Sequence, residues 1–191
     1  MLKIFVILGS VRQNRFGEQP AQWVMDELKK YHEIEAELID LKTLSLPMFD
    51  EPVSPSMNQG KYAHQEAVAW AKKVAEADGF IIVTPEYNHG YPSGLKNAID
   101  YVYAEWNNKP VAFVSYGGIS GGTRAVQQLR QVAVELQMTP IRAGVHMPMY
   151  WSNLDEKGKM KPELYQSQVD TMIPQLIWWA NALKAARESS K

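Results

Sequence analysis

Residues 84–97, with the sequence TPEYNHGYPSGLKN, hold a dense set of side chains that can bind a ligand. They include two tyrosines, a carboxylate, an imidazole and carboxamides, and two prolines and two glycines give the segment a rigid, irregular backbone. A connection that only reverses the chain is usually shorter and built of small polar residues. We therefore predict that residues 85–88, and those that follow them in this segment, form a binding loop. The alternative is an ordered loop that only packs on its own helix.

A second candidate is the segment of residues 10–17, SVRQNRFG, which precedes a predicted helix. Its hydroxyl, amide and guanidinium groups, with free N–H groups at the helix start, suit a phosphate whose charge Arg12 would neutralise. The segment lacks the Lys-Ser/Thr pair of a nucleoside-triphosphate loop and the G-x-G-x-x-G of a dinucleotide loop, so one phosphate is the simplest ligand. Alternatively, Ser10 only forms a turn and Arg12 is an ordinary surface charge.

A third loop, residues 115–118 with the sequence SYGG, follows another apolar strand. Glycines let backbone amides approach the edge of a ring, and tyrosines pack against aromatic faces. A planar heteroaromatic ring with one phosphate describes FMN, so we expect FMN between the three loops. The tyrosines have an alternative role as core residues, and for Tyr91 the two interpretations are equally supported.

The elements that must position these loops follow from hydrophobic patterning. Residues 4–8, 80–83 and 111–114 are apolar throughout, as in central parallel strands, whereas residues 33–40 and 141–147 mix polar and apolar positions, as in edge strands. This pattern selects a doubly wound α/β sheet with the order 2-1-3-4-5. The switch point of that order lies between the first and third strands, so the first two loops should face each other across one crevice.

Helices are predicted between the strands, and residues 44–58, which contain three prolines, are predicted to form an irregular surface loop. The predicted helices lie at about residues 21–28, 61–77, 94–103, 125–136 and 165–186.

Composition sets further limits on the fold and the partners. The length suits one domain spanning residues 1–191, and a formal net charge of -1 argues against a nucleic-acid partner. The chain has no cysteine, and its four histidines lack metal-binding spacing, so we expect no disulfide and no metal site. The apolar run at residues 4–8 is too short to cross a membrane and is not followed by a cleavage site. We therefore expect a cytoplasmic protein without a membrane partner.

Several motifs together resemble the NAD(P)H-dependent FMN reductases of flavodoxin-like fold, a family that includes quinone, chromate and azo reductases. They are GSVR at 9–12, PEYN at 85–88, LKNAIDY at 95–101, GG at 117–118 and GGTR at 121–124. The resemblance runs along roughly the whole chain, and its most specific part is the PEYN block with the LKN that follows it. It implies a three-layer α/β/α sandwich and an enzyme that binds FMN and uses NADPH or NADH as substrate.

The resemblance also implies roles for residues. Phosphate ligands are expected in the first loop, and the other two loops are expected to lie on either side of the isoalloxazine ring. The expected cofactor-binding residues are Ser10, Arg12, Asn14, Phe16, Pro85, Glu86, Tyr87, Asn88, Ser115, Tyr116, Gly117 and Gly118. Asn14 departs from the serine that is frequent near this place, and Arg15-Phe16 makes the loop bulkier than usual. No side chain is expected to act as a catalytic acid or base.

The expected reaction passes hydride from nicotinamide to FMN and then to a small-molecule acceptor by ping-pong. The rival functions are an FMN electron carrier of flavodoxin type, whose usual strongly acidic surface does not fit a charge of -1, and an esterase or phosphatase that uses the anion loop. We also expect a homodimer or homotetramer, because surplus apolar residues would be covered by a partner. These residues are Trp106, Met147, Met149, Tyr150 and Trp151.

Overall fold

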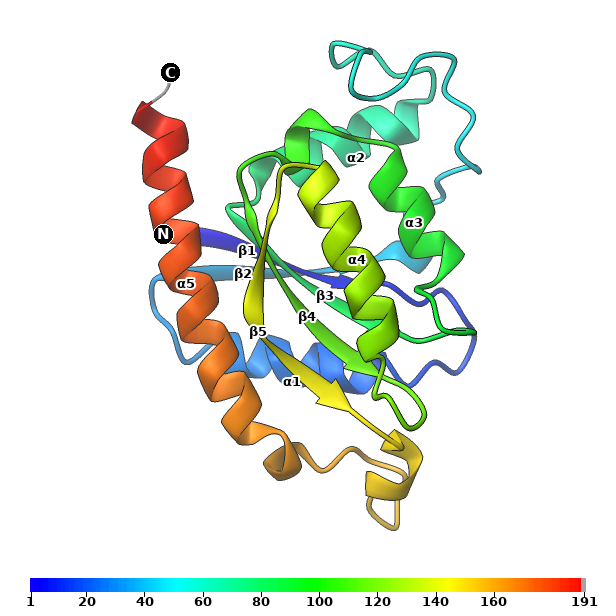
Figure 1. The fold of residues 1–191 in the computed structure, drawn as a ribbon, viewed down its shortest axis with the longest axis vertical. Coiled ribbons are helices and arrows are strands. Elements are labelled where there is room, and N and C mark those ends of the chain that lie inside the picture. Colours follow the sequence, from blue (N-terminus) through cyan, green and yellow to red (C-terminus); the bar gives the residue numbers. More distant parts are fainter. Residues whose placement is uncertain (190–191) are drawn as a thin grey trace.

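The computed structural model describes residues 1–189 as a parallel five-stranded sheet between two layers of helices (Figure 1). The strands lie in the order β2-β1-β3-β4-β5, which confirms the predicted flavodoxin-like arrangement. The strands are Leu2–Leu8 (β1), Ile34–Asp40 (β2), Gly79–Pro85 (β3), Pro110–Tyr116 (β4) and Thr139–Met147 (β5). The α-helices are Glu18–Leu28 (α1), Gln65–Glu76 (α2), Ser93–Asp100 (α3), Thr123–Glu135 (α4) and Gln166–Ser189 (α5).

Burial along the strands explains this order. Every residue of β3 and β4 is buried, and β1 is buried except at Lys3, so these three strands form the centre of the sheet. Strands β2 and β5 keep partly exposed positions and occupy the two edges. Because a central parallel strand is covered on both faces, it needs apolar side chains at consecutive positions.

Each face of the sheet carries its own hydrophobic core. Phe5 and Ile7 of β1 point to the layer of α2, α3 and α4, where Trp70 is also buried. Ile4, on the opposite face of the same strand, packs in the layer of α1 and α5. The alternation of side chains along β1 therefore joins the two cores through one strand.

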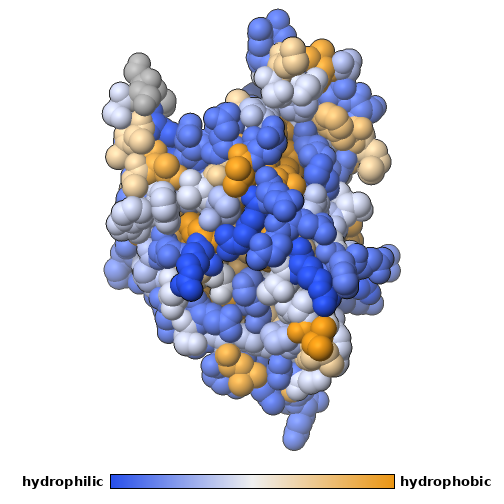
Figure 2. Space-filling view, viewed as in Figure 1, coloured by the Kyte–Doolittle hydropathy of each residue, from blue (hydrophilic) through white to orange (hydrophobic). Residues whose placement is uncertain are grey.

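The loop of residues 44–58 is irregular, as predicted, and projects beyond the helices at the top of Figure 1. Its most exposed apolar side chains, Met48 and Met57, retain 76% and 73% of their accessible surface. Figure 2 shows hydrophobic residues in this projecting part among hydrophilic neighbours. Within residues 1–189, no helix combines the length and the hydrophobicity needed to cross a membrane.

Two helices are shorter than predicted. Helix α2 begins at Gln65 rather than residue 61, because the amide of Ala63 donates to the Glu51 carboxylate (2.9 Å) and ties the preceding residues to the loop. Helix α3 ends at Asp100, and the apolar residues that follow it continue into a short 3-10 helix, Ala104–Trp106. Buried residues lie between these two helices, so the apolar pattern in the sequence continues beyond the end of α3.

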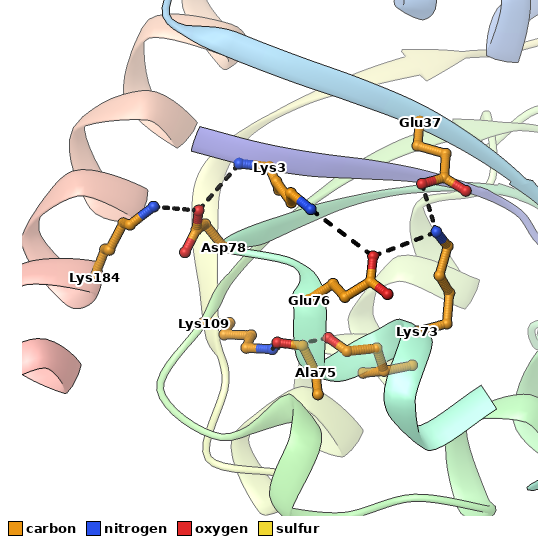
Figure 3. A network of polar contacts seen from close by, with 9 residues as sticks. Lys3, Glu37, Lys73, Ala75, Glu76, Asp78, Lys109 and Lys184 are labelled. Carbon is orange, nitrogen blue, oxygen red and sulfur yellow. Dashed lines mark hydrogen bonds and ion pairs between the residues drawn. The ribbon is translucent and has the colours of Figure 1, made fainter. Parts of the chain in front are cut away.

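A network of charges holds the elements together at the amino-terminal edge of the sheet (Figure 3). Asp78, which precedes β3, accepts hydrogen bonds from Lys184 (2.8 Å) and Arg187 (2.9 Å) of α5 and from the backbone amide of Lys3 (3.0 Å). It is only 8% exposed, so these contacts are partly shielded from water. The carboxylate therefore fixes α5 to the start of two central strands.

Lys109 lies in the same region, immediately before β4. Its ammonium group donates to the backbone carbonyls of Val74 (2.8 Å) and Ala75 (3.1 Å) in the last turn of α2. Carbonyls in the last turn of a helix lack the usual partner four residues later, although that of Val74 also accepts from the amide of Ala77 (3.3 Å), and a cation interacts favourably with the negative end of the helix dipole. Lys109, just before β4, thus caps the carboxyl terminus of α2.

The ionisation of Lys109 should appear in the pH dependence of stability. Burial lowers the pKa of its amine from the ordinary 10.5 to about 8. Between these values the unfolded chain binds a proton that the folded chain does not, so the free energy of unfolding gains a term that rises with pH. We expect the difference between wild type and Lys109→Met, measured by urea denaturation, to increase from about pH 8 to pH 10.5. The exposed Lys72→Met serves as control, and a pH-independent difference for Lys109→Met would contradict the assignment.

Candidate functional site

Three loops meet at the carboxyl-terminal edge of β1, β3 and β4, as the strand order requires. They enclose a cavity of about 230 Å³, together with a segment that follows β5. The lining residues are Arg12, Asn14, Arg15, Phe16, Pro85, Glu86, Tyr87, Tyr116, Gly117, Gly118, Tyr150 and Trp151. The predicted residues are therefore gathered at one site, with the exception of Ser10, Asn88 and Ser115.

A larger cavity, of about 410 Å³, lies at the opposite edge of the sheet. It is lined by the polar network around Asp78 and Lys109, whose charged groups are mostly bonded to one another. Its lining contains no aromatic side chain. We place the functional site in the smaller cavity, because only there do aromatic rings, glycines and a free cation converge at a topological switch point.

The two arginines of the first loop have different roles. Arg15 is buried, and its guanidinium forms an ion pair with Asp40 at the end of β2 and donates to the carbonyl of Ser10 (2.5 Å). Its pKa is raised, first of all by the hydrogen bond to Asp40. Arg12 is exposed and lies over the ring of Tyr87, 5.6 Å from its centroid. Arg12 is therefore the arginine available to an anion, and Arg15 shapes the loop.

The backbone of the first loop offers further donors. Within residues 1–189, no hydrogen bond joins the amides of Asn14, Arg15 and Phe16 to another protein atom. Helix α1 begins directly after them, and its N-cap, Gly17, supplies no side-chain cap. Unpaired amides at the positive end of a helix dipole attract a negative charge. The loop therefore has the donor set that a phosphate requires.

Ser10 is buried below the cavity rather than in its lining. Its hydroxyl shares a hydrogen bond of 2.8 Å with the hydroxyl of Tyr87 and lies 3.4 Å from the amide of Arg12, which donates to it. Ser10 thus connects the first loop to the second.

A carboxylate connects the second loop to the residues that follow the third loop. Glu86 accepts hydrogen bonds from the hydroxyl of Ser120 (2.7 Å) and from the backbone amide and guanidinium of Arg124 (both 3.1 Å). Burial alone would raise the pKa of Glu86, but these hydrogen bonds outweigh it and lower that pKa below its usual value. The carboxylate is therefore ionised at neutral pH and holds the two loops at a fixed separation.

The remaining two predicted residues shape the loops without lining the cavity. Asn88 is exposed in a tight turn in which Tyr87 and Gly90 exchange backbone hydrogen bonds, and its φ of 51° is in the left-handed region that asparagine tolerates. Ser115 is buried, and its hydroxyl donates to the carbonyl of Gly121 (2.7 Å) while also contacting Nδ1 of His146 (2.8 Å).

Two cavity residues were assigned by sequence reasoning to a subunit contact instead. Tyr150 stacks on Phe16 with ring centroids 4.2 Å apart and planes 22° apart, and Trp151 packs edge-on against Tyr150. They close the site from the segment after β5. In the sequence, Tyr150 and Trp151 indicated exposed apolar surface. No local feature of the sequence indicated that Tyr150 packs against Phe16.

For two other residues, the structure corrects the expectation of exposed apolar surface. Trp106 and Met147 were expected to be exposed, yet they are 1% and 0% exposed. Trp106 packs against Phe80 and Trp70 in one core, and Met147, the last residue of β5, belongs to the other. Only Met149 and Trp151, at 42% and 50%, remain largely exposed.

The hydrogen bonds of Glu86 predict that the free energy of unfolding depends on pH. At neutral pH, Glu86→Gln should lower the free energy of unfolding by about 1.5–3 kcal/mol, the range for hydrogen bonds to a charged group. Because the folded-state pKa lies below the ordinary 4.5, this contribution is present above pH 4.5 and is lost as the pH falls through the lower value. The difference between wild type and Glu86→Gln, measured by urea denaturation, should therefore shrink in acid. The exposed Glu163→Gln is the control, and a difference that persists at low pH would refute the link.

The residues present fit a flavin mononucleotide. Arg12 and the unpaired amides of the first loop match one phosphate. The backbone of Gly117 and Gly118 and the ring of Tyr87 border the same cavity, which suits a planar ring. The acidic side chain that lines the cavity, Glu86, is neutralised by its own partners.

Comparison with known proteins agrees with this donor set. The family model described as NADPH-dependent FMN reductase matches residues 2–152. An NAD(P)H-dependent FMN reductase of Schizosaccharomyces pombe is 44% identical over 148 residues, which are 76% of this chain and 74% of the relative. A quinone reductase of Escherichia coli is 36% identical over 141 residues, 71% of each protein.

A solved structure shows the same fold over nearly the whole chain. FerB, a flavoenzyme NAD(P)H:(acceptor) oxidoreductase from Paracoccus denitrificans, superposes with a TM-score of 0.69 at 17% identity, covering 97% of this chain and 98% of FerB. The family itself follows from the match of the family model and from the sequence relatives. The chain belongs to the NADPH-dependent FMN reductase family of oxidoreductases, in which NAD(P)H is the electron donor and FMN the flavin.

Proposed function

We propose that this chain binds FMN between its three loops and reduces a small-molecule acceptor in two successive half-reactions. In the first, hydride passes from NADPH or NADH to the flavin; in the second, electrons pass to a free flavin, a quinone, an azo compound or chromate. The observation that carries the proposal is the free Arg12 guanidinium beside unpaired amides, at one end of a cavity bordered by Tyr87, Gly117 and Gly118. This arrangement matches the two chemically different ends of FMN.

The residues bind and orient, and the flavin supplies the hydride-accepting chemistry when bound. Arg12 and the amides of residues 14–16 hold the phosphate, and the loops on either side of the ring set its position. Glu86 keeps these two loops together through Ser120 and Arg124. Because this carboxylate is ionised and fully engaged, it orients the site without exchanging a proton with the substrate.

The size of the site supports a ping-pong order. Ligand pockets usually measure about 300–1,000 Å³, and this cavity is smaller, at about 230 Å³. With a cofactor in place, it has no room for a nicotinamide and an acceptor side by side. We infer that the two substrates use the same open face of the ring in turn.

We further propose a homodimer or homotetramer in the cytoplasm. The supporting observation is the exposed apolar surface beside the cavity, where Ile119 is 81% exposed and Met149 and Trp151 follow β5. A second copy that covered this surface would also shield the mouth of the site. The absence of cysteine suits a reducing compartment.

Arg12 provides a direct test of the phosphate site. Arg12→Ala should weaken FMN binding about ten- to a hundredfold, because it removes a charge-assisted hydrogen bond worth about 1.5–3 kcal/mol. Titration of apoprotein, followed by flavin fluorescence, measures the dissociation constant. The exposed Arg142→Ala is the matched control, and an unchanged constant for Arg12→Ala would exclude Arg12 from the site.

Steady-state kinetics test the order of the half-reactions. When NAD(P)H is varied at several fixed concentrations of a quinone, the double-reciprocal lines should be parallel. Stopped-flow mixing with NAD(P)H alone should also reduce the flavin completely before any acceptor is added. Intersecting lines together with a measurable ternary complex would contradict a shared ring face.

A further inference from the structure

Tyr116, the last residue of β4, lines the cavity and also contacts the first loop. Its side chain is 4% exposed and lies beside Gly17, where an added Cβ atom would be 2.6 Å from the tyrosine hydroxyl. Its ring also meets Phe16 edge-on, with centroids 5.1 Å apart. The side chain therefore supports the loop of residues 10–17 from below.

The hydroxyl of Tyr116 lies close to that loop, because a Cβ atom on Gly17 would be 2.6 Å from it. Burial, the largest influence, raises the pKa of Tyr116, although the side chain of Ser10 and the backbone of Gly17 act to lower it, so the hydroxyl stays neutral at physiological pH. Ser10 in turn contacts the hydroxyl of Tyr87 (2.8 Å), which extends the network to the second loop.

This network holds both ends of the stretch whose amides are unpaired. Ser10, which is bonded to Tyr87, precedes the amides of residues 14–16, and Gly17, which lies against Tyr116, follows them, so the backbone is restrained on both sides. Such support preorganises the donors, because they need not be ordered when an anion arrives. Removing the hydroxyl while keeping the ring should therefore cost affinity only for ligands that carry the anion.

We infer that Tyr116 is a positioning residue for the phosphate of FMN, acting through Ser10 and Gly17 without touching the ligand's ring. The inference rests on the proposed FMN site and assigns a different role to a residue that sequence reasoning placed beside the isoalloxazine. Gly17 is its necessary counterpart, because any side chain there would displace the hydroxyl.

The test compares two flavins that differ only in the phosphate. Apoprotein is titrated with FMN and with riboflavin, and dissociation constants come from quenching of flavin fluorescence. For Tyr116→Phe we expect the FMN constant to rise about three- to tenfold, because the buried hydroxyl no longer supports Gly17, while the riboflavin constant stays within about twofold. Tyr103→Phe, which removes a hydroxyl bonded to the carbonyl of Glu135 in the other core, should change neither constant.

A double-variant cycle separates positioning from general loosening of the loop. Gly17→Ala should weaken FMN binding in wild type by pushing the Tyr116 hydroxyl away, and it should have a smaller effect in the Tyr116→Phe background, where that contact is gone. Competition by inorganic phosphate against FMN gives an independent measure, since its inhibition constant should rise in Tyr116→Phe as the FMN constant does.

The outcomes distinguish this inference from the proposed site. If wild type bound neither flavin, or if phosphate did not compete with FMN, the proposed site itself would be wrong. If wild type bound FMN with phosphate competition, but Tyr116→Phe changed both flavin constants equally or changed neither, the site would stand and the role of Tyr116 would be refuted. Additive effects of the two variants would refute the coupling through Gly17.

Discussion

The ion pair between the buried Arg15 and the partly exposed Asp40 is the constraint on which the functional edge of the sheet depends. A buried charge is costly unless it is paired and hydrogen-bonded, and Arg15 meets this condition through Asp40, Glu18 and the carbonyl of Ser10. These contacts fold the first loop back onto the end of β2. With Arg15 engaged there, the loop presents its unpaired amides and Arg12 to the cavity.

The other loops are joined to this one by short polar links rather than by packing alone. Ser10 and Tyr87 connect the first loop to the second, and Glu86 connects the second to the third through Ser120 and Arg124. Each link is satisfied within the protein, so the cavity is shaped before a ligand arrives. Preorganisation of this kind reduces the entropy lost on binding and fixes the geometry in which a cofactor can react.

The fold was largely predictable from sequence, because consecutive apolar residues mark strands covered on both faces and alternation marks edges. The same logic placed the three loops in one crevice. It chose Arg12 for the phosphate but gave no partner to Arg15, since the pairing of Arg15 depends on Asp40 in a different strand. It also misjudged Trp106 and Met147, because their burial depends on tertiary neighbours that no local period reveals. The stacking of Tyr150 on Phe16 was missed for the same reason.

The amino-terminal and carboxyl-terminal ends of the strands have different roles. At the amino-terminal edge, Asp78 and Lys109 attach α5 and α2 to the central strands, far along each strand from the loops that form the cavity. Substitutions in the loops therefore leave these attachments in place. The residues around the cavity can therefore be replaced without removing the contacts that hold α2 and α5 to the sheet.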